Sequence, residues 1–244
     1  MFIRSISHHY PKLKLEANSF LIGEEQGHKK LIGTSQLYQA APNETASDLG
    51  FYAAKKILER VRPESIDVIL FSSLTLDYHA PSTASILHER LQLKTNCAAI
   101  DLPLGCTGFT TALMVAHGIF RDSSIQRVLV VLGEVPRHAI HPDDSSLLCL
   151  FGDAGSAILL ENSDKNIPFV FGNDGKGFNA LHVLEGGARN PMNQNSFSSE
   201  LSYPFLNHFG RIFMDGQEIL KLTLQHVPNA VFDLLDKAKL SIEE

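Results

Sequence analysis

The stretch DLPLGCTGF, residues 101–109, places a cysteine between the end of an apolar run and the start of a helical pattern. Residues 97–102 are predicted to form a strand, and residues 107–120, rich in small side chains, to form a helix. Cys106 would therefore lie on a sharp strand-to-helix turn, where the helix offers free backbone N–H groups and the positive end of its dipole. Both features favour the thiolate, which is the nucleophilic form of cysteine.

Glycines near Cys106 support a functional interpretation of this cysteine. Gly105 and Gly108 allow a tight turn and the close approach of a substrate. An arbitrary cysteine is more often a small buried hydrophobic side chain, and we assign that interpretation to Cys97 and Cys149, which lie in apolar runs. The nucleophile turn of serine hydrolases needs glycine two residues before the nucleophile, where this chain has leucine.

Strand and helix patterns alternate on both sides of this turn. Buried strands are expected at residues 66–71, 128–132 and 156–160, and helices at residues 46–61 and 81–91. Thr45 and Asp48 fit a capping box at the start of the first helix. This alternation predicts an α/β sheet with helices on both faces.

The later part of the chain has weaker patterns. Residues 161–210 are dense in Gly, Asn and Ser, and we predict a long excursion with one or two short strands, such as residues 169–171. A helical pattern resumes over residues 214–239, where Pro228 should kink or break the helix.

Composition excludes several kinds of protein. The chain has 244 residues, 44% of them hydrophobic, which is enough for a sizeable core. A net charge of -6 and a pI of about 6.0 do not favour nucleic acid binding. The sequence has no apolar run long enough to span a membrane, no signal-peptide pattern at its start, and three cysteines, too few for a disulfide framework. We expect a cytoplasmic protein with reduced thiols.

Several stretches resemble β-ketoacyl-acyl-carrier-protein synthase III, a family of thiolase-type condensing enzymes. DLPLGCTGF resembles the family's nucleophile segment D-x-x-x-x-C-x-G-F, and FGDAGSA (residues 151–157) resembles its F-G-D-G-A-G-A stretch. GE and HPDD (residues 133–134 and 141–144) resemble its connecting loop. MDGQEI (residues 214–219) resembles the start of a helix in its second half. The matches keep their order and spacing over about residues 44–244.

The resemblance implies a thiolase fold, with two similar halves in five layers, and a homodimer. It implies acyl transfer to Cys106, then condensation with a malonyl-type extender on acyl carrier protein, in fatty-acid or specialised lipid and polyketide synthesis. Acyl-coenzyme A or acyl-carrier protein would be the substrate, with no cofactor and no metal. Residues 1–160 would form the complete βαβαβ first half, residues 161–210 an inserted excursion, and residues 211–244 the start of an incomplete second half.

A short similarity within the chain agrees with two halves. The helix-to-strand segment at residues 55–67 resembles the chain end at residues 237–244, which suggests an internal duplication cut early in its second copy. Chance similarity between two short turns is the alternative.

The resemblance also implies roles for particular residues. Besides the nucleophile, they are substrate binding by Ala80, Phe109 and Gly187, and structural support near the site by Gly105, Gly108, Gly152 and Asp153. In the family a bulky residue often stands at the position of Ala80 and closes the acyl pocket of the dimer partner. We therefore expect a roomier pocket, for medium or long acyl groups rather than acetyl.

Two departures from the family bear on mechanism and substrate. The family completes its site with a His and an Asn in the second half, which polarise the malonyl thioester. We expect both beyond Glu244, in a longer parent protein, and assign no role to the eleven histidines. The chain has no Trp, and Ser145 stands where the initiating enzymes use Arg to bind coenzyme A. An acyl group on a carrier protein is therefore favoured over a coenzyme A primer.

Other polar groupings carry less weight. His138 and His141 with Asp143 and Asp144 have a spacing seen in metal sites, but a polar loop is the favoured interpretation. Glu134, at the end of a predicted strand, is either a base in an unusual homologue or a hydrogen-bonded strand-end carboxylate, and the second is favoured.

Two other functions stay open from the sequence. One is acyl transfer from Cys106 to a hydroxyl or amine without decarboxylation. The other is a non-catalytic partner subunit or fragment that shapes another subunit's pocket. The presence of Cys106 argues against the second.

Overall fold

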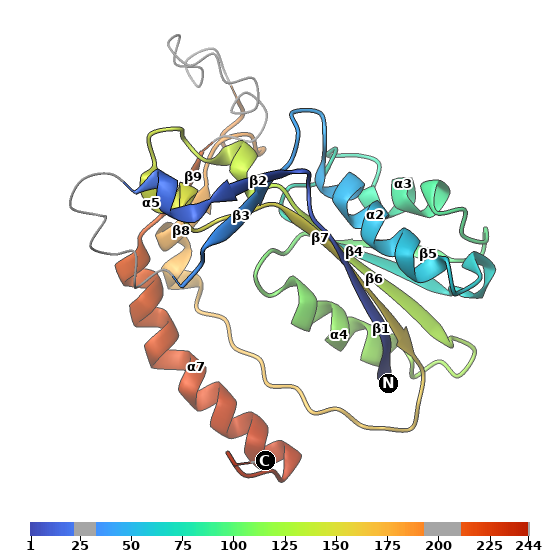
Figure 1. Ribbon diagram of the computed structural model, residues 1–244. Coiled ribbons are helices and arrows are strands. Elements are labelled where there is room, and N and C mark those ends of the chain that lie inside the picture. Colours follow the sequence, from blue (N-terminus) through green and yellow to red (C-terminus); the bar gives the residue numbers. More distant parts are fainter. Residues whose placement is uncertain (22–32, 193–210, 244) are drawn as a thin grey trace. The chain divides into compact units, whose positions relative to one another are not determined.

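The computed structural model describes residues 1–21, 33–192 and 211–243, which divide into two compact units (Figure 1). The sheet unit comprises Met1–His138 and Pro142–Lys165. The C-terminal unit comprises Ala139–His141 and Asn166–Glu244.

A mixed five-stranded sheet forms the centre of the sheet unit. Its strands lie in the order β1 (Phe2–His9), β7 (Ala154–Glu161), β6 (Arg127–Glu134), β4 (Val68–Ser72) and β5 (Ala98–Leu102). Strands β6, β4 and β5 are parallel, whereas β7 is antiparallel to both β6 and β1. The carboxyl ends of the three parallel strands therefore meet at one edge of the sheet, where parallel α/β proteins commonly bind ligands.

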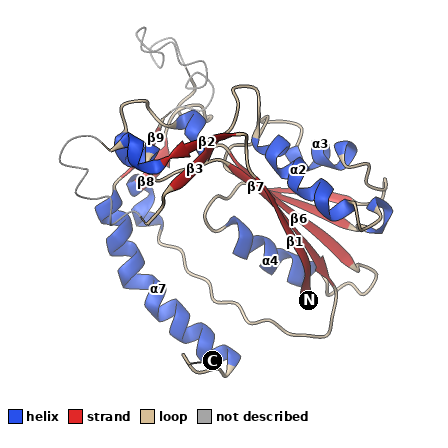
Figure 2. Ribbon diagram, viewed as in Figure 1, coloured by secondary structure: helices blue, strands red, loops and turns tan. Residues whose placement is uncertain are grey.

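Helices cover both faces of this sheet, as the sequence predicts (Figures 1 and 2). α2 (Ala46–Leu58) and α3 (Thr83–Arg90) pack on one face, and α4 (Gly108–Ile119) packs against β4 and β6 on the other. The shorter elements of the unit are β2 (Leu13–Glu16), which pairs with β3 (Gln36–Gln39), the 3-10 helices η1 (Ala17–Phe20), η3 (Pro63–Ser65) and η4 (Pro136–Ala139), and the one-turn helix α5 (Ser145–Leu148).

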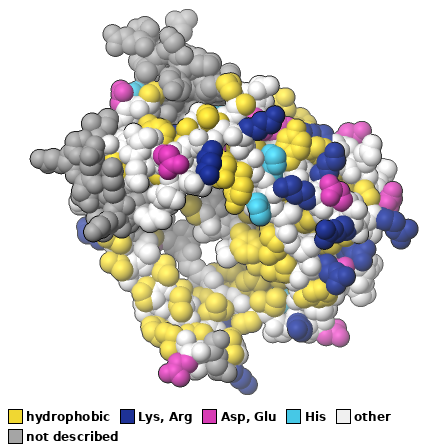
Figure 3. Space-filling view, viewed as in Figure 1, with side chains coloured by type: hydrophobic (Ala, Val, Ile, Leu, Met, Phe, Trp, Pro, Cys, Tyr) yellow, Lys and Arg dark blue, Asp and Glu magenta, His cyan; other side chains and the backbone are white. Residues whose placement is uncertain are grey.

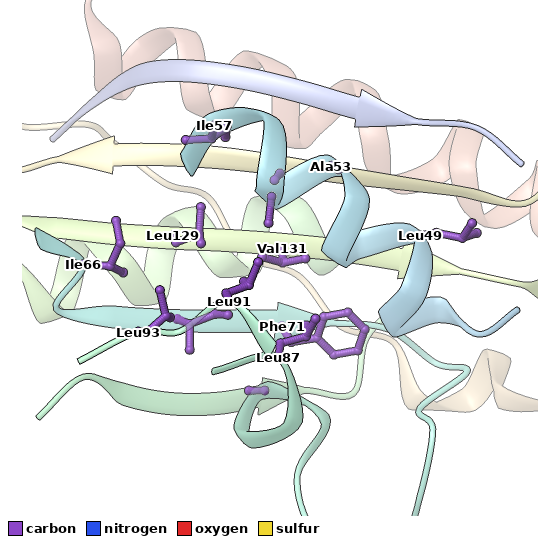
Figure 4. Close-up of a cluster of buried hydrophobic side chains, with 14 of the residues drawn as sticks. Leu49, Ala53, Ile57, Ile66, Phe71, Leu87, Leu91, Leu93, Leu129 and Val131 are labelled. Carbon is purple, nitrogen blue, oxygen red and sulfur yellow. The ribbon is translucent and has the colours of Figure 1, made fainter. Parts of the chain in front are cut away.

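The core lies between the sheet and the α2–α3 layer. Alternate residues of β4 and β6, including Phe71, Leu129 and Val131, contact the apolar faces of both helices (Figure 4). All five residues of β4 are buried, which explains why its sequence is a continuous apolar run instead of an alternating one. The predictions of buried strands in these regions are confirmed.

The start of α2 follows its sequence closely. The Asp48 carboxylate accepts a hydrogen bond from the backbone N–H of Thr45 at 2.9 Å, which completes the predicted capping box. The helix ends at Leu58, three residues before the predicted end at residue 61, and Pro63 opens η3 shortly afterwards.

Two paired glycines allow α2 to lie directly on the sheet. Gly133 of β6 and Gly155 of β7 are partners in the antiparallel register. A Cβ atom at Gly133 would meet the carbonyl oxygen of Ala46, and one at Gly155 would meet the backbone of Leu49. Any side chain on either strand position would therefore push the helix away from the strands.

The C-terminal unit contains a short strand pair and one long helix. η5 (Gly175–Ala180) precedes β8 (Leu181–Val183), which pairs with β9 (Ile212–Met214), and α7 (Gly216–Ala238) follows. The strand predicted at residues 169–171 is wrong: Phe169 and Phe171 lie in an irregular segment, with their rings stacked at 6.2 Å.

Pro228 does not break α7, because the helix continues through it, whereas the kink that the sequence also allows at Pro228 stays a prediction. Asp215 caps its start by accepting hydrogen bonds from Gln217 and Glu218, and Lys239 ends it in the left-handed conformation. Pro228 has no backbone N–H to donate, and the 23 residues of α7 nevertheless form one helix. Large apolar side chains along α7, such as Leu224 and Phe232, are exposed. Hydrophobic side chains gather over this helix in Figure 3.

Candidate active site

Cys106 lies between β5 and α4, in a turn that the Gly108 N–H closes with a hydrogen bond to the Gly105 carbonyl at 2.8 Å. It directly precedes Thr107, the N-cap residue of α4. Cys106 is exposed, whereas Cys97 and Cys149 are buried. The chain thus has one accessible thiol, and it stands at the start of a 12-residue helix.

The last residue of β4, Ser72, forms a hydrogen bond with this turn. The Ser72 hydroxyl donates a hydrogen bond to the Leu104 carbonyl at 2.8 Å. A Cβ atom at Gly108 would meet the Ser72 hydroxyl, and one at Gly105 would lie 2.8 Å from a Leu74 methyl group. Both glycines are therefore needed for the close approach of the turn to β4 and its following loop.

Asp101 has a role that the sequence analysis missed. Its carboxylate accepts hydrogen bonds from the backbone N–H groups of Thr83 and Ala84, both at 2.7 Å. These donors belong to the first turn of α3, where a carboxylate also interacts favourably with the helix dipole. Asp101 thus joins the end of β5 to α3. The only indication of this role in the sequence is that Asp101 stands five residues before Cys106, as in the pattern D-x-x-x-x-C-x-G-F.

Gly152 and Asp153 directly precede β7 and contact residues at the end of β3 and just after it. Asp153 is 1% exposed and accepts hydrogen bonds from the backbone N–H groups of Ala40 at 2.7 Å and Arg137 at 3.2 Å. A Cβ atom at Gly152 would lie 3.3 Å from the Tyr38 nitrogen. Burial raises the pKa of Asp153 to about 6, although these hydrogen bonds and the Arg137 charge act in the opposite direction.

This raised pKa predicts a specific dependence of stability on pH. The folded protein binds the Asp153 proton more tightly than the unfolded chain, whose ordinary value is 3.8. The contribution of Asp153 to the free energy of unfolding is therefore largest below about pH 4 and declines as the pH rises to about 6. Asp153→Asn does not titrate.

Denaturation of both proteins at a series of pH values tests this expectation. The free energy of unfolding of the wild type, minus that of Asp153→Asn, should fall by on the order of 2–3 kcal/mol between about pH 4 and pH 7. A difference that stays constant or rises with pH would contradict the raised pKa.

The remaining predicted site residues fall in three places. Phe109 lies in the first turn of α4 and is 36% exposed. Ala80 is exposed in the loop between β4 and α3, which Asp77 anchors by accepting a hydrogen bond from the Ser47 hydroxyl. Gly187 belongs to the C-terminal unit, in a turn where its carbonyl accepts a hydrogen bond from the Asn190 N–H.

The structure thus brings Cys106, Gly105, Gly108 and Phe109 together at one turn. Among the residues described by the structure, no group of three or more His, Cys, Asp or Glu side chains is arranged to hold a metal ion. Within the same ranges, no helix has the length and apolar character needed to cross a membrane.

The segment that contains the Cys106 turn matches a known protein family. The family model for 3-oxoacyl-[acyl-carrier-protein] synthase III matches residues 100–175, from β5 through the Cys106 turn to beyond β7. A putative 3-oxoacyl-[acyl-carrier-protein] synthase 3 of Campylobacter jejuni is 32% identical over 219 residues, which are 87% of this chain and 61% of that protein. The chain spans about three fifths of the length of the curated relatives it matches.

Solved structures agree over nearly the whole chain. A 3-oxoacyl-(acyl-carrier-protein) synthase III superposes with a TM-score of 0.88 at 29% identity, covering 99% of this chain and 75% of that one. The 3-oxoacyl-(acyl carrier protein) synthase of Burkholderia xenovorans LB400 gives 0.85 at 31% identity, covering 98% and 69%. The fold and the cysteine-bearing turn therefore define a thiolase-like α/β protein. The chain belongs to the 3-oxoacyl-[acyl-carrier-protein] synthase III family.

Proposed function

We propose that the protein is a condensing acyltransferase that first captures an acyl group on Cys106. The observation that carries this proposal is the accessible thiol at the start of α4, in a chain of this family. The Cys106 thiolate would attack the carbonyl carbon of an acyl thioester and release the donor thiol. The new thioester would then react with a malonyl-type extender on acyl carrier protein, losing carbon dioxide and returning the thiolate.

The turn geometry supports the first step. Cys106 stands one residue before the N-cap of α4, and the start of a helix offers backbone N–H groups that have no partner within the helix. The same groups, with the helix dipole, stabilise negative charge that develops on a carbonyl oxygen at this position. No metal or redox cofactor takes part in this chemistry, which needs only the two acyl substrates.

The proposed partners are acyl carrier protein and a second copy of the chain. β5 is an edge strand of the five-stranded sheet, and its Ile100 is 39% exposed. The unpaired backbone groups of such an edge favour pairing with another strand. We further propose a cytoplasmic location and a role in fatty-acid or specialised lipid and polyketide synthesis.

We also propose that the chain is organised as a first thiolase-like half, an excursion and the start of a second half, over residues 1–160, 161–210 and 211–244. The boundary between the units near Lys165 supports the end of the first half near residue 160.

Intact-protein mass spectrometry tests the proposed function. Incubation with octanoyl-carrier protein or octanoyl-coenzyme A should add one octanoyl group, with faster loading from the carrier protein. Condensation also requires the family's His and Asn. In a protein that carries both, addition of malonyl-carrier protein should then remove the group and yield a 3-oxoacyl product. An adduct that transfers only to a hydroxyl or amine would overturn condensation, and the absence of an adduct with every donor would overturn acyl capture.

The exposed Ala80 predicts the chain length of the acyl group. We expect octanoyl to load faster than acetyl, because alanine leaves space where a bulky side chain would close the pocket. Ala80→Phe should slow octanoyl loading by about tenfold and acetyl loading much less, since overfilling a site costs about 1–3 kcal/mol. Ala80→Val serves as an intermediate control. Faster loading of acetyl than octanoyl by the wild type would contradict this expectation.

A further inference from the structure

Glu134 ends β6 with both carboxylate oxygens directed into the loop after β4. Its Oε1 atom accepts a hydrogen bond from the Leu74 N–H at 2.7 Å, and its Oε2 atom accepts one from the Thr75 hydroxyl at 3.0 Å. The Thr75 hydroxyl in turn accepts a hydrogen bond from the Val135 N–H at 3.1 Å. Burial raises the pKa of Glu134 against the effect of these hydrogen bonds. The carboxylate thus ties the β4 loop to the end of β6.

The same loop touches the turn that carries Cys106. A Cβ atom at Gly105 would lie 2.8 Å from the Cδ1 atom of Leu74 and 3.7 Å from Oε1 of Glu134. The Leu74 side chain is otherwise 66% exposed, so few other contacts hold it in place. The position of Leu74 depends on the hydrogen bond from its backbone N–H to Glu134, and the position of Gly105 depends in part on Leu74.

We propose that Glu134 is a positioning residue for Cys106, acting through Leu74 and Gly105. This inference deepens the proposed function and rests on it. Stabilisation of charge at a helix terminus falls off within one turn, so the thiolate loses reactivity if the Gly105–Gly108 turn shifts from the start of α4. The two hydrogen bonds occupy both oxygens of Glu134 and favour this role over that of a general base.

Alkylation of Cys106 by iodoacetamide at neutral pH tests the inference without any acyl donor. Glu134→Ala should slow the reaction by about fivefold, the size of a helix-terminus charge effect. Glu134→Gln keeps an oxygen that accepts the Leu74 N–H, and it should stay within about twofold of the wild type. Leu74→Ala should slow the reaction like Glu134→Ala, and the double variant should be no slower than either, because both changes break one chain of contacts.

Two controls separate positioning from general loosening. Glu161→Ala removes another carboxylate of the sheet, which pairs with Arg127 at 2.9 Å at the opposite end of β6 and β7, and should leave the rate unchanged. Cys97 and Cys149 are buried and should stay unlabelled in every variant.

Three results would overturn the inference. They are a wild-type rate in Glu134→Ala, equal slowing in Glu134→Gln, and slowing that is accompanied by labelling of the buried cysteines. Failure of acyl capture with a normal pattern of alkylation would instead reject the proposed function and leave the positioning contacts intact.

Discussion

Replacing Cys106 with serine should lower acyl capture by more than about 1,000-fold, because the hydroxyl is not ionised at neutral pH and needs an adjacent base to attack a thioester. Cys106 is exposed, so the smaller oxygen leaves no cavity and the fold should persist. The measurement is the rate at which the intact mass increases by one acyl group on incubation with octanoyl-carrier protein.

Cys97→Ser and Cys149→Ser are the matched controls for this change. Both side chains are buried, and burial raises the pKa of Cys97 to about 11, which keeps it protonated and unreactive. Each control should lose some stability but retain the acyl adduct. An undiminished rate in Cys106→Ser would show that another group accepts the acyl chain.

Gly155→Ala should destabilise the sheet unit by about 3 kcal/mol, at the upper end of the cost of overpacking. The added methyl group would meet the backbone of Leu49, and backbone cannot move aside as a flexible side chain can. Displacement of α2 would also disturb Ser47, which anchors Asp77 in the loop that carries Ala80. Acyl capture should therefore decline together with stability, measured by denaturant unfolding followed by circular dichroism.

Gly118→Ala is the control for this change. Gly118 lies within α4, and a Cβ atom there meets no atom within 4 Å. Alanine favours the helix over glycine by up to about 1 kcal/mol, so the variant should be as stable as the wild type or slightly more so. An unchanged unfolding midpoint in Gly155→Ala would contradict the close packing of α2 on the glycine pair.

The sequence predicted those parts of the fold whose signals are local. β4 has a continuous apolar run, α2 has a capping box, and the turn around Cys106 combines glycines with a change from strand to helix pattern. Each of these signals arises from residues that are neighbours along the chain, so the pattern alone indicates the element.

The parts that were missed depend on contacts between distant residues. β1 was not predicted, and it is defined by its pairing with β7, where Phe2 lies opposite Glu161. The role of Asp101 as a cap of α3 likewise depends on how loops meet at the ends of the strands. The sequence predicted Glu134 as a hydrogen-bonded carboxylate at the end of a strand, but not that Leu74 is its partner. The rings of Phe169 and Phe171 favour a strand by composition, but no partner strand is present beside them in the described residues.

Peptide mapping of the octanoylated protein by tandem mass spectrometry tests the central claim most directly, because it locates the acyl group without any substitution. We predict that the octanoyl group lies on Cys106, in the peptide containing GCTGF, and that the peptides containing Cys97 and Cys149 are unmodified. An octanoyl group on any other residue, with Cys106 free, would contradict the assignment of Cys106 as the acyl-accepting nucleophile.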